Sequence, residues 1–423
     1  MLDIKFIQAN QEQIALAIKN KNCDIDLSTL LKLHEQRNAI MQSIETLNQQ
    51  KKSNAANFDG KGKPSDEAIE TGKKIKTELE TLQKDFNALD SQYQQLLLLV
   101  PNVYSEDTPV GKDESGNVEF KRVGEPKAFD FPVKSHIELG EALNLLDLDR
   151  GVKAAGFRGY YLKNDLALLH WGLLTLAIQR MVKAGFQPMI TPTMVREMAL
   201  VGSGHFPAGK DEIYQTKDNE ESEIKYLAGT SEPSLMAYRA DEIIDLKELP
   251  LKYCGISPCY RREVGSYGKD TKGIYRVHEF FKVEQVVICQ ADIKAAMKHF
   301  EEMLKIVTDL LADLELPFRI LQICTGDMGA GKYKMYDVET WMPSRNAYSE
   351  THSLSFLTDY QTRRLNIRYK DKKGNNIHPF SLNNTVIASP RILIAILENY
   401  QQADGTIAVP KILQEFVGKK LIK

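Results

Sequence analysis

Apolar residues recur at spacings of three and four in two stretches of the N-terminal quarter of the chain. The first stretch starts at Leu27, with Arg37 in one position of its apolar stripe, and the second ends at Leu99. Such heptad spacing predicts two helices that each bury one face. Residues 53–66 between them are dense in Gly, Asn and Pro and cannot continue a helix. The pattern therefore predicts an antiparallel coiled-coil hairpin over about residues 27–99.

The pattern changes after residue 100. Pro101 ends the second helix, and residues 101–130 read as a polar linker rich in Asp, Glu, Gly and Pro. Beyond it, helical periodicity alternates with β-branched runs such as KVEQVVIC. This alternation predicts an α+β domain that extends to the C-terminus. Two domains also suit 423 residues, a length that exceeds one ordinary hydrophobic core.

Composition narrows the function classes only slightly. The chain is 43% hydrophobic and 26% charged, with a formal net charge of −2, so binding to nucleic acid would depend on a local basic patch. The five cysteines lack zinc-ligand spacing, and we expect buried thiols in a reducing compartment. No apolar run reaches the length of a membrane span, and no signal-peptide core is visible. We therefore expect a cytoplasmic protein with no membrane partner.

Basic residues gather toward the tip of the predicted hairpin. They favour contact with a polyanion, although charged flanks of coiled coils are usually only solvated. A dimerisation or scaffold coiled coil is the alternative explanation of the heptads. Periodicity alone leaves these alternatives open. The lysines concerned are Lys51, Lys52, Lys61, Lys63, Lys73 and Lys74.

The stretch CYRREVGSYGKDTKGIYRVHEFFKVEQ predicts two strands joined by a mobile, turn-rich loop. Arg261 and Glu263 lie two residues apart, so on a strand both side chains point to the same face. Phe280, Lys282 and Glu284 alternate on one face of the second strand. Planar arginine donors suit a phosphate, and an aromatic ring can stack on a base. The alternative is a solvated ladder of salt bridges.

Two further stretches flank this candidate site. NDLALLHWGLLTLAIQRMVKAGFQPMITPTMV predicts a long helix capped by Asn164 and a strand that ends at Pro192. SPRILIAILENYQ predicts a helix with Ser389 as N-cap and Arg391 in its first turn. An arginine gains nothing from the dipole at a helix N-terminus, so binding of an anion explains Arg391 better than stability does.

The run Tyr260–Glu263 resembles the second signature motif of class II aminoacyl-tRNA synthetases, whose core reads Phe-Arg-any-Glu, with a tyrosine in place of the phenylalanine. Its continuation resembles the seryl-tRNA synthetases in particular, with Lys269 and Lys272 where arginines are common. The helix and strand from Asn164 are similar to the first motif, and the helix with Arg391 to the third.

Shorter segments strengthen the resemblance. AGTSEPSL, YSETHSLSF and SLNNT each have counterparts in seryl-tRNA synthetases, although GTSEP alone could be a plain helix cap. Asn384 stands where some of these enzymes have glycine. The resemblance covers the whole chain. It implies an N-terminal tRNA-binding domain over 1–104 and a class II catalytic domain, an antiparallel sheet flanked by helices, over 105–423.

The resemblance also implies an activity. Serine and ATP would give seryl-adenylate and pyrophosphate, and the serine would then pass to the 3′ end of tRNA(Ser), and of tRNA(Sec) where the cell has one. Mg²⁺ would assist, the enzyme would be a homodimer, and the hairpin would lie across the long variable arm of the tRNA, with salt-sensitive backbone contacts made by its lysines.

Residue roles follow from the same resemblance. Arg261, Glu263 and Arg391 would be catalytic, and Glu350 and Ser353 would bind Mg²⁺, which prefers hard oxygen ligands. Phe280 and Arg391 would sandwich the adenine, and Arg276 and Arg391 would hold the outer phosphates. The residues expected to bind ATP are Arg261, Arg262, Glu263, Arg276, Val277, Phe280, Glu350, Thr351, His352, Ser353 and Arg391.

For the amino acid, Glu284 and Thr230 would take the ammonium group and Thr385 would meet the hydroxyl. A buried polar site of this kind rejects alanine, because its groups would be left unpaired. The residues expected to bind serine are Thr230, Ser231, Glu232, Arg261, Glu284, Asn383 and Thr385.

Two other classes of protein remain as alternatives. A related ligase that loads a carrier protein is expected to lack the hairpin. A non-catalytic scaffold on the same fold usually loses the arginines or the metal carboxylate, whereas Arg261, Glu350 and Arg391 are all present here.

Overall fold

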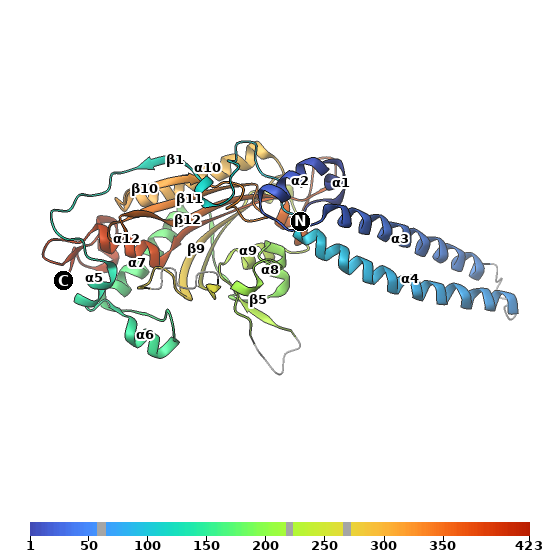
Figure 1. The fold of residues 1–423 in the computed structure, drawn as a ribbon, viewed down its shortest axis with the longest axis horizontal. Coiled ribbons are helices and arrows are strands. Elements are labelled where there is room, and N and C mark those ends of the chain that lie inside the picture. The colour runs from blue at the N-terminus through green and yellow to red at the C-terminus, as the bar shows by residue number, and fades with distance from the viewer. Residues whose placement is uncertain (57–64, 217–222, 265–271) are drawn as a thin grey trace. The chain divides into compact units, whose positions relative to one another are not determined.

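The computed structural model describes residues 1–56, 65–216, 223–264 and 272–423 (Figure 1). Contacts divide the described chain into two compact units, one of residues 2–19 and 23–101 and one of the remaining residues. None of the described helices is long and apolar enough to cross a membrane. Two of the hairpin lysines, Lys61 and Lys63, lie outside the described residues.

The N-terminal unit contains the hairpin that the heptads predict. Helices α1 (Ile4–Ala9) and α2 (Gln11–Asn20) precede α3 (Leu27–Ala56), which lies antiparallel beside α4 (Asp66–Leu99) (Figure 1). The apolar positions of the heptads are buried or half-buried along both helices. Ser65 accepts a hydrogen bond from the backbone of Ala68 and so caps α4, as a serine at this position commonly does.

Arg37 shows how the hairpin tolerates a charge in its apolar stripe. Its guanidinium lies 5.1 Å from the ring centroid of Phe86 and 5.4 Å from that of Tyr93. Its Nε lies 2.5 Å from a carboxylate oxygen of Asp90. Two aromatic rings and a carboxylate of α4 thus surround the charge of Arg37.

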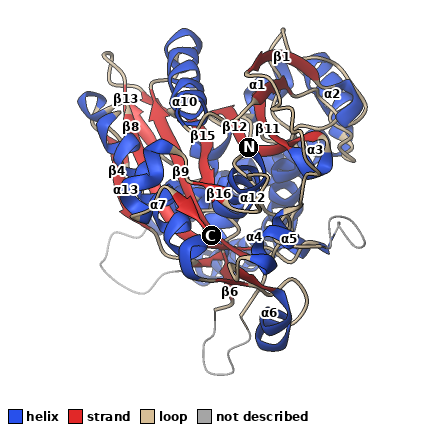
Figure 2. Ribbon diagram, turned by 90° about the vertical axis from the view of Figure 1, so that its left-hand side faces the viewer, coloured by secondary structure: helices blue, strands red, loops and turns tan. Residues whose placement is uncertain are grey.

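The second unit is built on an eight-stranded sheet, counted over the described residues (Figure 2). All neighbouring strands are antiparallel except β4 and β8, which are parallel. The order is β1 (Val118–Val123), β10 (Phe318–Gln322), β11 (Lys334–Met342), β12 (Ala347–Thr358), β15 (Phe380–Ala388), β9 (Glu279–Cys289), β8 (Leu251–Tyr260) and β4 (Gln187–Ile190). The predicted α+β class, an antiparallel sheet with helices, is confirmed.

Three helices cover one face of this sheet: α7 (Asn164–Lys183), α10 (Ile293–Asp313) and α12 (Ser389–Asn399). Their apolar faces form the main core with Val283 and Val287 of β9 and Leu382 of β15. Because strand side chains alternate, Glu284 and Val286 between these valines point to the other face, while Gln285 points into the core, where its Nε2 donates to Sδ of Met181. The helices therefore occupy one face and leave the second for the site.

Smaller elements complete the unit. The short helices are α5 (His136–Ala142), α6 (Leu148–Ala155), α8 (Glu197–Ser203), α9 (Glu232–Ala237), α11 (Tyr360–Arg364) and α13 (Gln414–Val417). The short strands pair as β2 (Leu146–Asp147) with β3 (Tyr161–Leu162), β5 (Met194–Arg196) with β6 (Lys225–Leu227), β16 (Ile407–Ala408) with β17 (Leu421–Ile422), and β13 (Arg368–Lys370) with β14 (Asn376–Ile377) and β7 (Ile243–Ile244).

Three local predictions were wrong. The stretch read as a polar linker contains β1, an edge strand that pairs with β10 through its backbone while Phe120 stays 59% exposed. Asn164 is the first residue of α7, with Lys163 as N-cap, and its side chain donates to the carbonyl of Asn144. Ser389 likewise begins α12 and Ala388 is the N-cap, so both helices start one residue earlier than predicted.

Candidate active site

The site begins with the alternation along β9. Val283 and Val287 point into the helical core, so Phe280, Lys282 and Glu284 point to the opposite face. All three side chains are buried there, at 9%, 4% and 3% exposure. Lys282 and Glu284 are thus two charged side chains buried side by side. Burying a charge costs free energy unless the charge is paired, so we expect these two residues to have a function.

Arg261 and Glu263 reach the same space by a different route from the one predicted. Strand β8 ends at Tyr260, so both residues lie just beyond the strand and not on it. Arg261 still donates its backbone N–H to the carbonyl of His278, at 2.9 Å. Glu263 has a φ of 55°, a left-handed conformation that turns its carboxylate toward Arg276, whose Nη1 lies 2.7 Å away.

A pocket on this face collects most of the residues predicted to bind ATP. Arg261 lies over the ring of Phe280, with its guanidinium carbon 5.4 Å from the ring centroid, and Arg391 lies over the ring of Tyr275 at 4.7 Å. The pocket is lined by Arg261, Glu263, Tyr275, Arg276, Val277, Phe280, Lys282, Glu350, Thr351, Thr385, Ala388, Pro390 and Arg391.

The inner end of the site holds an ion pair. Nζ of Lys282 lies 2.5 Å from Oε2 of Glu284, and the hydroxyl of Thr385 donates to the same oxygen at 3.5 Å. Burial raises the pKa of Glu284 above its usual value, although Lys282 opposes the shift. A carboxylate and a hydroxyl are thus brought together at a buried point.

A second pocket, of about 340 Å³, shares Arg261, Glu263 and Arg276 with the first and adds Thr230 and His205. The two pockets therefore adjoin each other at these shared side chains. Next to Thr230, the Ser231 hydroxyl lies over Gly255 of β8, where an added Cβ would come within 2.4 Å of it. Glycine is required at this position because the strand backbone passes directly beneath Ser231.

Glu232 is buried beside these residues, and its Oε1 accepts a hydrogen bond of 2.6 Å from Gln361. Burial raises the pKa of Glu232, but Lys332, His205 and the bond from Gln361 outweigh it and hold the pKa below the usual value. Burial lowers the pKa of His205 to about 4, so the imidazole is neutral at pH 7, and its Nδ1 lies 2.9 Å from the hydroxyl of Ser203.

The predicted metal ligands lie at the outer end, on β12. Oε2 of Glu350 lies 3.1 Å from Nη1 of Arg391, which also donates to the Glu350 carbonyl at 2.7 Å. Ser353 pairs across the ladder with Asp337 of β11, and one buried carboxylate oxygen of Asp337 has no hydrogen-bond partner. Burial, with Glu350 nearby, raises the pKa of Asp337 well above its ordinary value.

The structure does not bring every predicted residue to the pockets. His352 is 1% exposed, and its partner across the ladder is Val338, which belongs to the core under the helices. The β11–β12 register shifts between Val338 and Glu339, and this shift turns the side chain of His352 toward the core. Arg262 is exposed and outside both pockets. Asn383 is 5% exposed on β15 and does not line them. The other predicted residues that line neither pocket are Ser231, Glu232, Glu284 and Ser353. The predicted loop falls largely on residues 265–271, which lie outside the described residues.

Four residues at the site were missed by the sequence predictions. Lys282 was expected on the same strand face as Phe280 and Glu284, but no role was assigned to it. Tyr275 lies next to the predicted Arg276. His205 and Gln361 come from distant loops and helices, and no pattern in the sequence links them to the site.

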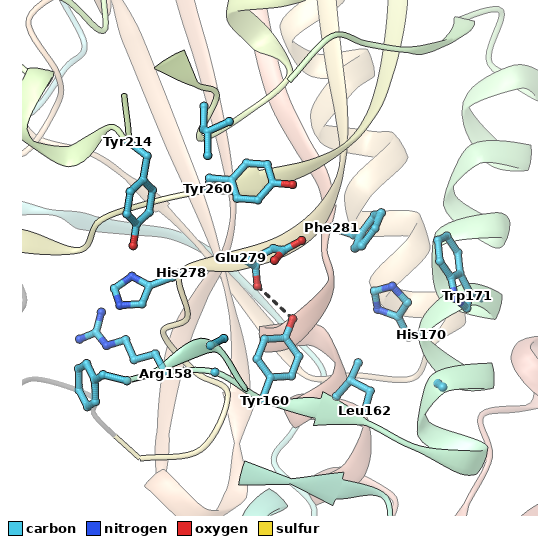
Figure 3. A pocket seen from close by; sticks show the side chains of 15 residues that line it. Arg158, Tyr160, Leu162, His170, Trp171, Tyr214, Tyr260, His278, Glu279 and Phe281 are labelled. Carbon is cyan, nitrogen blue, oxygen red and sulfur yellow. Dashed lines mark hydrogen bonds between the residues drawn. The ribbon is translucent and has the colours of Figure 1, made fainter. Parts of the chain in front are cut away.

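A larger pocket, of about 540 Å³, lies elsewhere and contains none of the predicted site residues (Figure 3). It is lined by aromatic side chains, including Tyr160, Trp171 and Phe281, and Tyr160 donates to the carbonyl of Glu279 at 3.1 Å. Its size alone does not make it the site of chemistry, because it has no group of arginines and carboxylates like that around Arg261.

Comparisons with known proteins agree with this geometry. Residues 1–104 match the seryl-tRNA synthetase N-terminal domain, and residues 214–400 match the tRNA synthetase class II core domain (G, H, P, S and T). A serine–tRNA ligase of Deinococcus radiodurans is 43% identical over 420 residues, which are 99% of this chain and 98% of that protein.

Solved structures agree as well. Seryl-tRNA synthetase of Pyrococcus horikoshii complexed with ATP is 35% identical, with a TM-score of 0.89 over 100% of this chain and 99% of that one. The cytoplasmic serine–tRNA ligase of Naegleria fowleri in complex with AMP is 30% identical, with a TM-score of 0.86 over the same shares. By its two domain matches and by its full-length relatives, the chain belongs to the seryl-tRNA synthetase family of class II aminoacyl-tRNA synthetases.

Proposed function

We propose that the pocket around Arg261 performs the reaction of this family. The protein is a serine–tRNA ligase that activates L-serine with ATP and transfers it to tRNA(Ser). The carrying observation is that two pockets adjoin at Arg261, Glu263 and Arg276, with Thr385 and Lys282 in the wall of the first and Thr230 in the wall of the second, so that ATP and serine can meet at Arg261. Charging of tRNA(Sec) stays a prediction.

Catalysis requires no side-chain nucleophile. The serine carboxylate attacks the α-phosphate, pyrophosphate leaves, and the protein contributes position and charge stabilisation. Arg261 is proposed to hold the carboxylate and the α-phosphate, since it stands between the two pockets. Glu263 is proposed to accept from the adenine amino group, and Arg276 and Arg391 to hold the outer phosphates. Val277, which is 4% exposed, is proposed to contact the base through its backbone.

The residues on β12 fit a magnesium ion. Glu350 and Ser353 offer hard oxygens, and the orphaned buried oxygen of Asp337 lies opposite Ser353. No group of three or more His, Cys, Asp or Glu in the described part of the chain is arranged to hold a metal, so substrate phosphates would supply the other ligands. Bound Mg²⁺ would neutralise phosphate charge. Glu350 would hold it while Arg391 orients the Glu350 carboxylate.

The serine side is proposed to use the buried group at the inner end. Glu284 takes the ammonium group together with Thr230, and Thr385 meets the hydroxyl, since its own hydroxyl already points toward Glu284. Ser231 and Glu232 shape the wall, and Asn383 supports the strand behind Thr385. A pocket lined by buried polar groups favours serine over alanine, because alanine leaves them unpaired.

The hairpin is proposed to bind the tRNA. Lys51, Lys52 and Lys73 are exposed on α3 and α4, while Lys74 pairs with Glu70 at 3.0 Å in the exposed geometry that contributes little to stability. Exposed lysines suit contacts to a phosphate backbone, which position the nucleic acid without reading bases.

A homodimer is proposed from the surface of α7 and β4. Leu168 and Trp171 of α7 are 47% and 54% exposed, and Ile190 at the end of the edge strand β4 is 89% exposed. Exposed apolar groups on an open sheet edge are typical of a protein–protein interface. The cytoplasmic location stays a prediction.

Serine-dependent ATP–pyrophosphate exchange with Mg²⁺ tests the activity, with alanine, threonine and glycine compared and no tRNA added. Exchange with serine alone is expected. Exchange with another amino acid would instead favour a carrier-protein ligase, and a folded dimer that shows no exchange would favour the scaffold alternative.

A further inference from the structure

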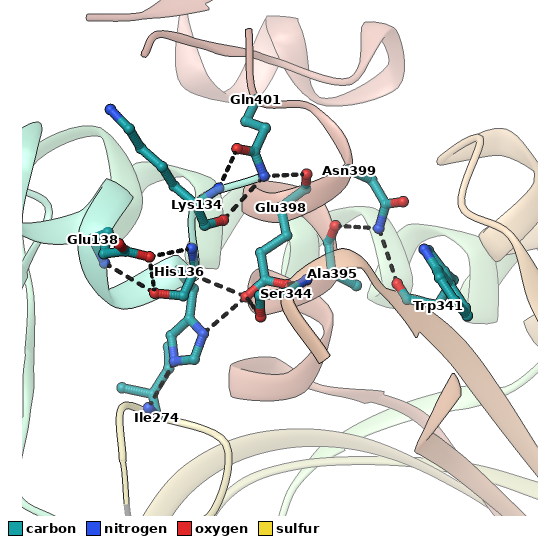
Figure 4. Close-up of polar contacts among 11 residues, drawn as sticks. Lys134, His136, Glu138, Ile274, Trp341, Ser344, Ala395, Glu398, Asn399 and Gln401 are labelled. Carbon is teal, nitrogen blue, oxygen red and sulfur yellow. Dashed lines mark hydrogen bonds and ion pairs between the residues drawn. The ribbon is translucent and has the colours of Figure 1, made fainter. Parts of the chain in front are cut away.

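A buried chain of hydrogen bonds connects helix α12 to the segment that carries Arg276 (Figure 4). Its first member is Glu398 of α12, which is 0% exposed. Oε1 of Glu398 accepts from the backbone N–H of His136 at 3.0 Å, from Nδ1 of His136 at 3.1 Å and from the hydroxyl of Ser344 at 2.8 Å. Oε2 accepts from the backbone of Ser344 at 3.0 Å.

The series of hydrogen bonds continues through the imidazole of His136. The backbone N–H of Ile274 donates to Nε2 of His136 at 3.3 Å, and both residues are buried, at 0% and 7% exposure. Because an amide N–H can only donate, Nε2 must be an acceptor and Nδ1 must carry the ring proton toward Glu398. The carboxylate therefore fixes the tautomer that Ile274 requires.

Glu398 is suited to remain charged in this place. Burial raises its pKa, but the hydrogen bonds from His136 and Ser344 outweigh burial and hold the pKa below its usual value. Four donors converge on two oxygens, so the group is fully satisfied although it has no access to water.

The segment held by His136 forms one wall of the nucleotide pocket. Gly273 has a φ of 67°, and a Cβ added to it would lie 2.1 Å from Nε2 of His136, so the backbone passes directly against the imidazole. The next residues are Tyr275, over which Arg391 stacks, and Arg276, which pairs with Glu263. Arg391 itself lies on α12, the helix that contains Glu398.

We propose that Glu398 and His136 are positioning residues for ATP: they hold segment 273–277 at a fixed place relative to α12, so that Arg276 and Arg391 meet the same nucleotide. The inference rests on the proposed function. Neither residue lines the nucleotide or the serine pocket, and Glu284 and Thr385 are held by strands β9 and β15 instead. A displacement of about 1 Å at a binding group lowers catalysis on the order of 10²-fold, so loss of the anchor should weaken ATP use and spare serine use.

Three substitutions of His136 in the full-length protein separate its hydrogen bond to Glu398 from its hydrogen bond to Ile274. His136→Phe fills the space without hydrogen bonds. In His136→Asn the side chain reaches only the position of Nδ1, so it can donate to Glu398 but not accept from Ile274. In His136→Gln the side chain reaches the position of Nε2 and can accept from Ile274. The matched control is Asn399→Ala, on the same helix as Glu398. It removes two buried hydrogen bonds, to the carbonyls of Trp341 and Ala395, but changes no contact with segment 273–277.

The measurement is the KM for ATP and for serine in pyrophosphate exchange, with ATP binding measured directly by equilibrium dialysis. We expect His136→Phe and His136→Asn to raise the KM and Kd for ATP at least about tenfold with the KM for serine within about twofold, and His136→Gln to restore the ATP values to within about threefold. Asn399→Ala is expected to lower the unfolding temperature without changing either KM.

Equal changes in both KM values, or the same ATP defect in Asn399→Ala, would overturn the inference, as would unchanged ATP binding in His136→Asn. If His136→Phe does not fold, the comparison of asparagine with glutamine still decides. Failure of the proposed function is distinguishable, because it would show as absent serine-dependent exchange in the parent protein, whereas the dialysis of ATP still tests the anchor.

Discussion

Acidification is expected to destabilise the second unit, which contains the candidate active site (the catalytic unit), through His352. The side chain of His352 is 1% exposed, and its Nδ1 lies 2.8 Å from the hydroxyl of Thr351. Burial lowers the pKa of His352 to about 3 from an ordinary value of 6.5. The unfolded chain therefore takes up the proton first as the pH falls. The contribution of the neutral His352 to the free energy of unfolding is fully present above about pH 6.5. It is lost progressively toward pH 3, by about 2 kcal/mol at pH 5 and about 3 kcal/mol at pH 4.

The substitution His352→Asn tests this magnitude, since asparagine does not titrate. Both tryptophans, Trp171 and Trp341, lie in the catalytic unit, so urea unfolding followed by fluorescence reports on that unit. We expect the variant to be less stable at pH 7.5 but to lose about 2 kcal/mol less than the parent between pH 7.5 and pH 5. Other buried imidazoles such as His170, whose pKa burial lowers to about 4, are common to both chains and cancel. Equal losses in parent and variant over this range would refute the reasoning.

Three other outcomes are expected. Glu284→Gln should raise the KM for serine about 10–100-fold and leave the KM for ATP nearly unchanged. Because burial raises the pKa of Glu284, the parent's KM for serine should rise on acidification and that of the variant should not; the same rise in both proteins would contradict the role of Glu284. Replacing Lys51 and Lys52 by glutamate should spare pyrophosphate exchange but weaken tRNA charging, with a smaller salt dependence, and equal loss of both activities would contradict a separate tRNA-binding arm. Arg37→Ala should destabilise the hairpin by about 1 kcal/mol, seen as a lower midpoint of helix loss in circular dichroism, with exchange as the control that should not move.

The hairpin and the strand β9 were predictable because their patterns are local. A heptad stripe and an alternating strand depend on residues three, four or two positions apart, and a sequence displays these spacings directly. Even Arg37, an apparent interruption, stays within the pattern, because Phe86 and Asp90 of the facing helix receive its side chain.

The errors arose where backbone geometry departs from ideal elements. Glu263 was assigned to a strand, but its positive φ turns its side chain into the pocket from beyond the strand end. His352 was assigned to the pocket because it follows Glu350 in a motif, but a register shift in the β11–β12 ladder points it to the core. Neither event has a signature in residue type.

Contacts between distant segments were also beyond prediction. Gln361 meets Glu232 across 129 positions of sequence, and Glu398 meets His136 across 262. Polar residues of this kind look like surface residues until the fold encloses them, so nothing in the local pattern distinguishes them.

The pairing of charges inside the pocket has a consequence for selectivity among anions. Arg276 with Glu263, Arg391 with Glu350, and Lys282 with Glu284 are each already neutralised by an internal counter-charge. An incoming anion must therefore exchange with a carboxylate before it gains any of these three cations, whereas Arg261, which donates to the carbonyl of Gly229, is reached without such an exchange. A small ion such as inorganic phosphate displaces at most one of the three carboxylates. Only a ligand that engages several pairs together recovers what each exchange gives up, so these three cations are screened against the abundant simple anions that surround the protein.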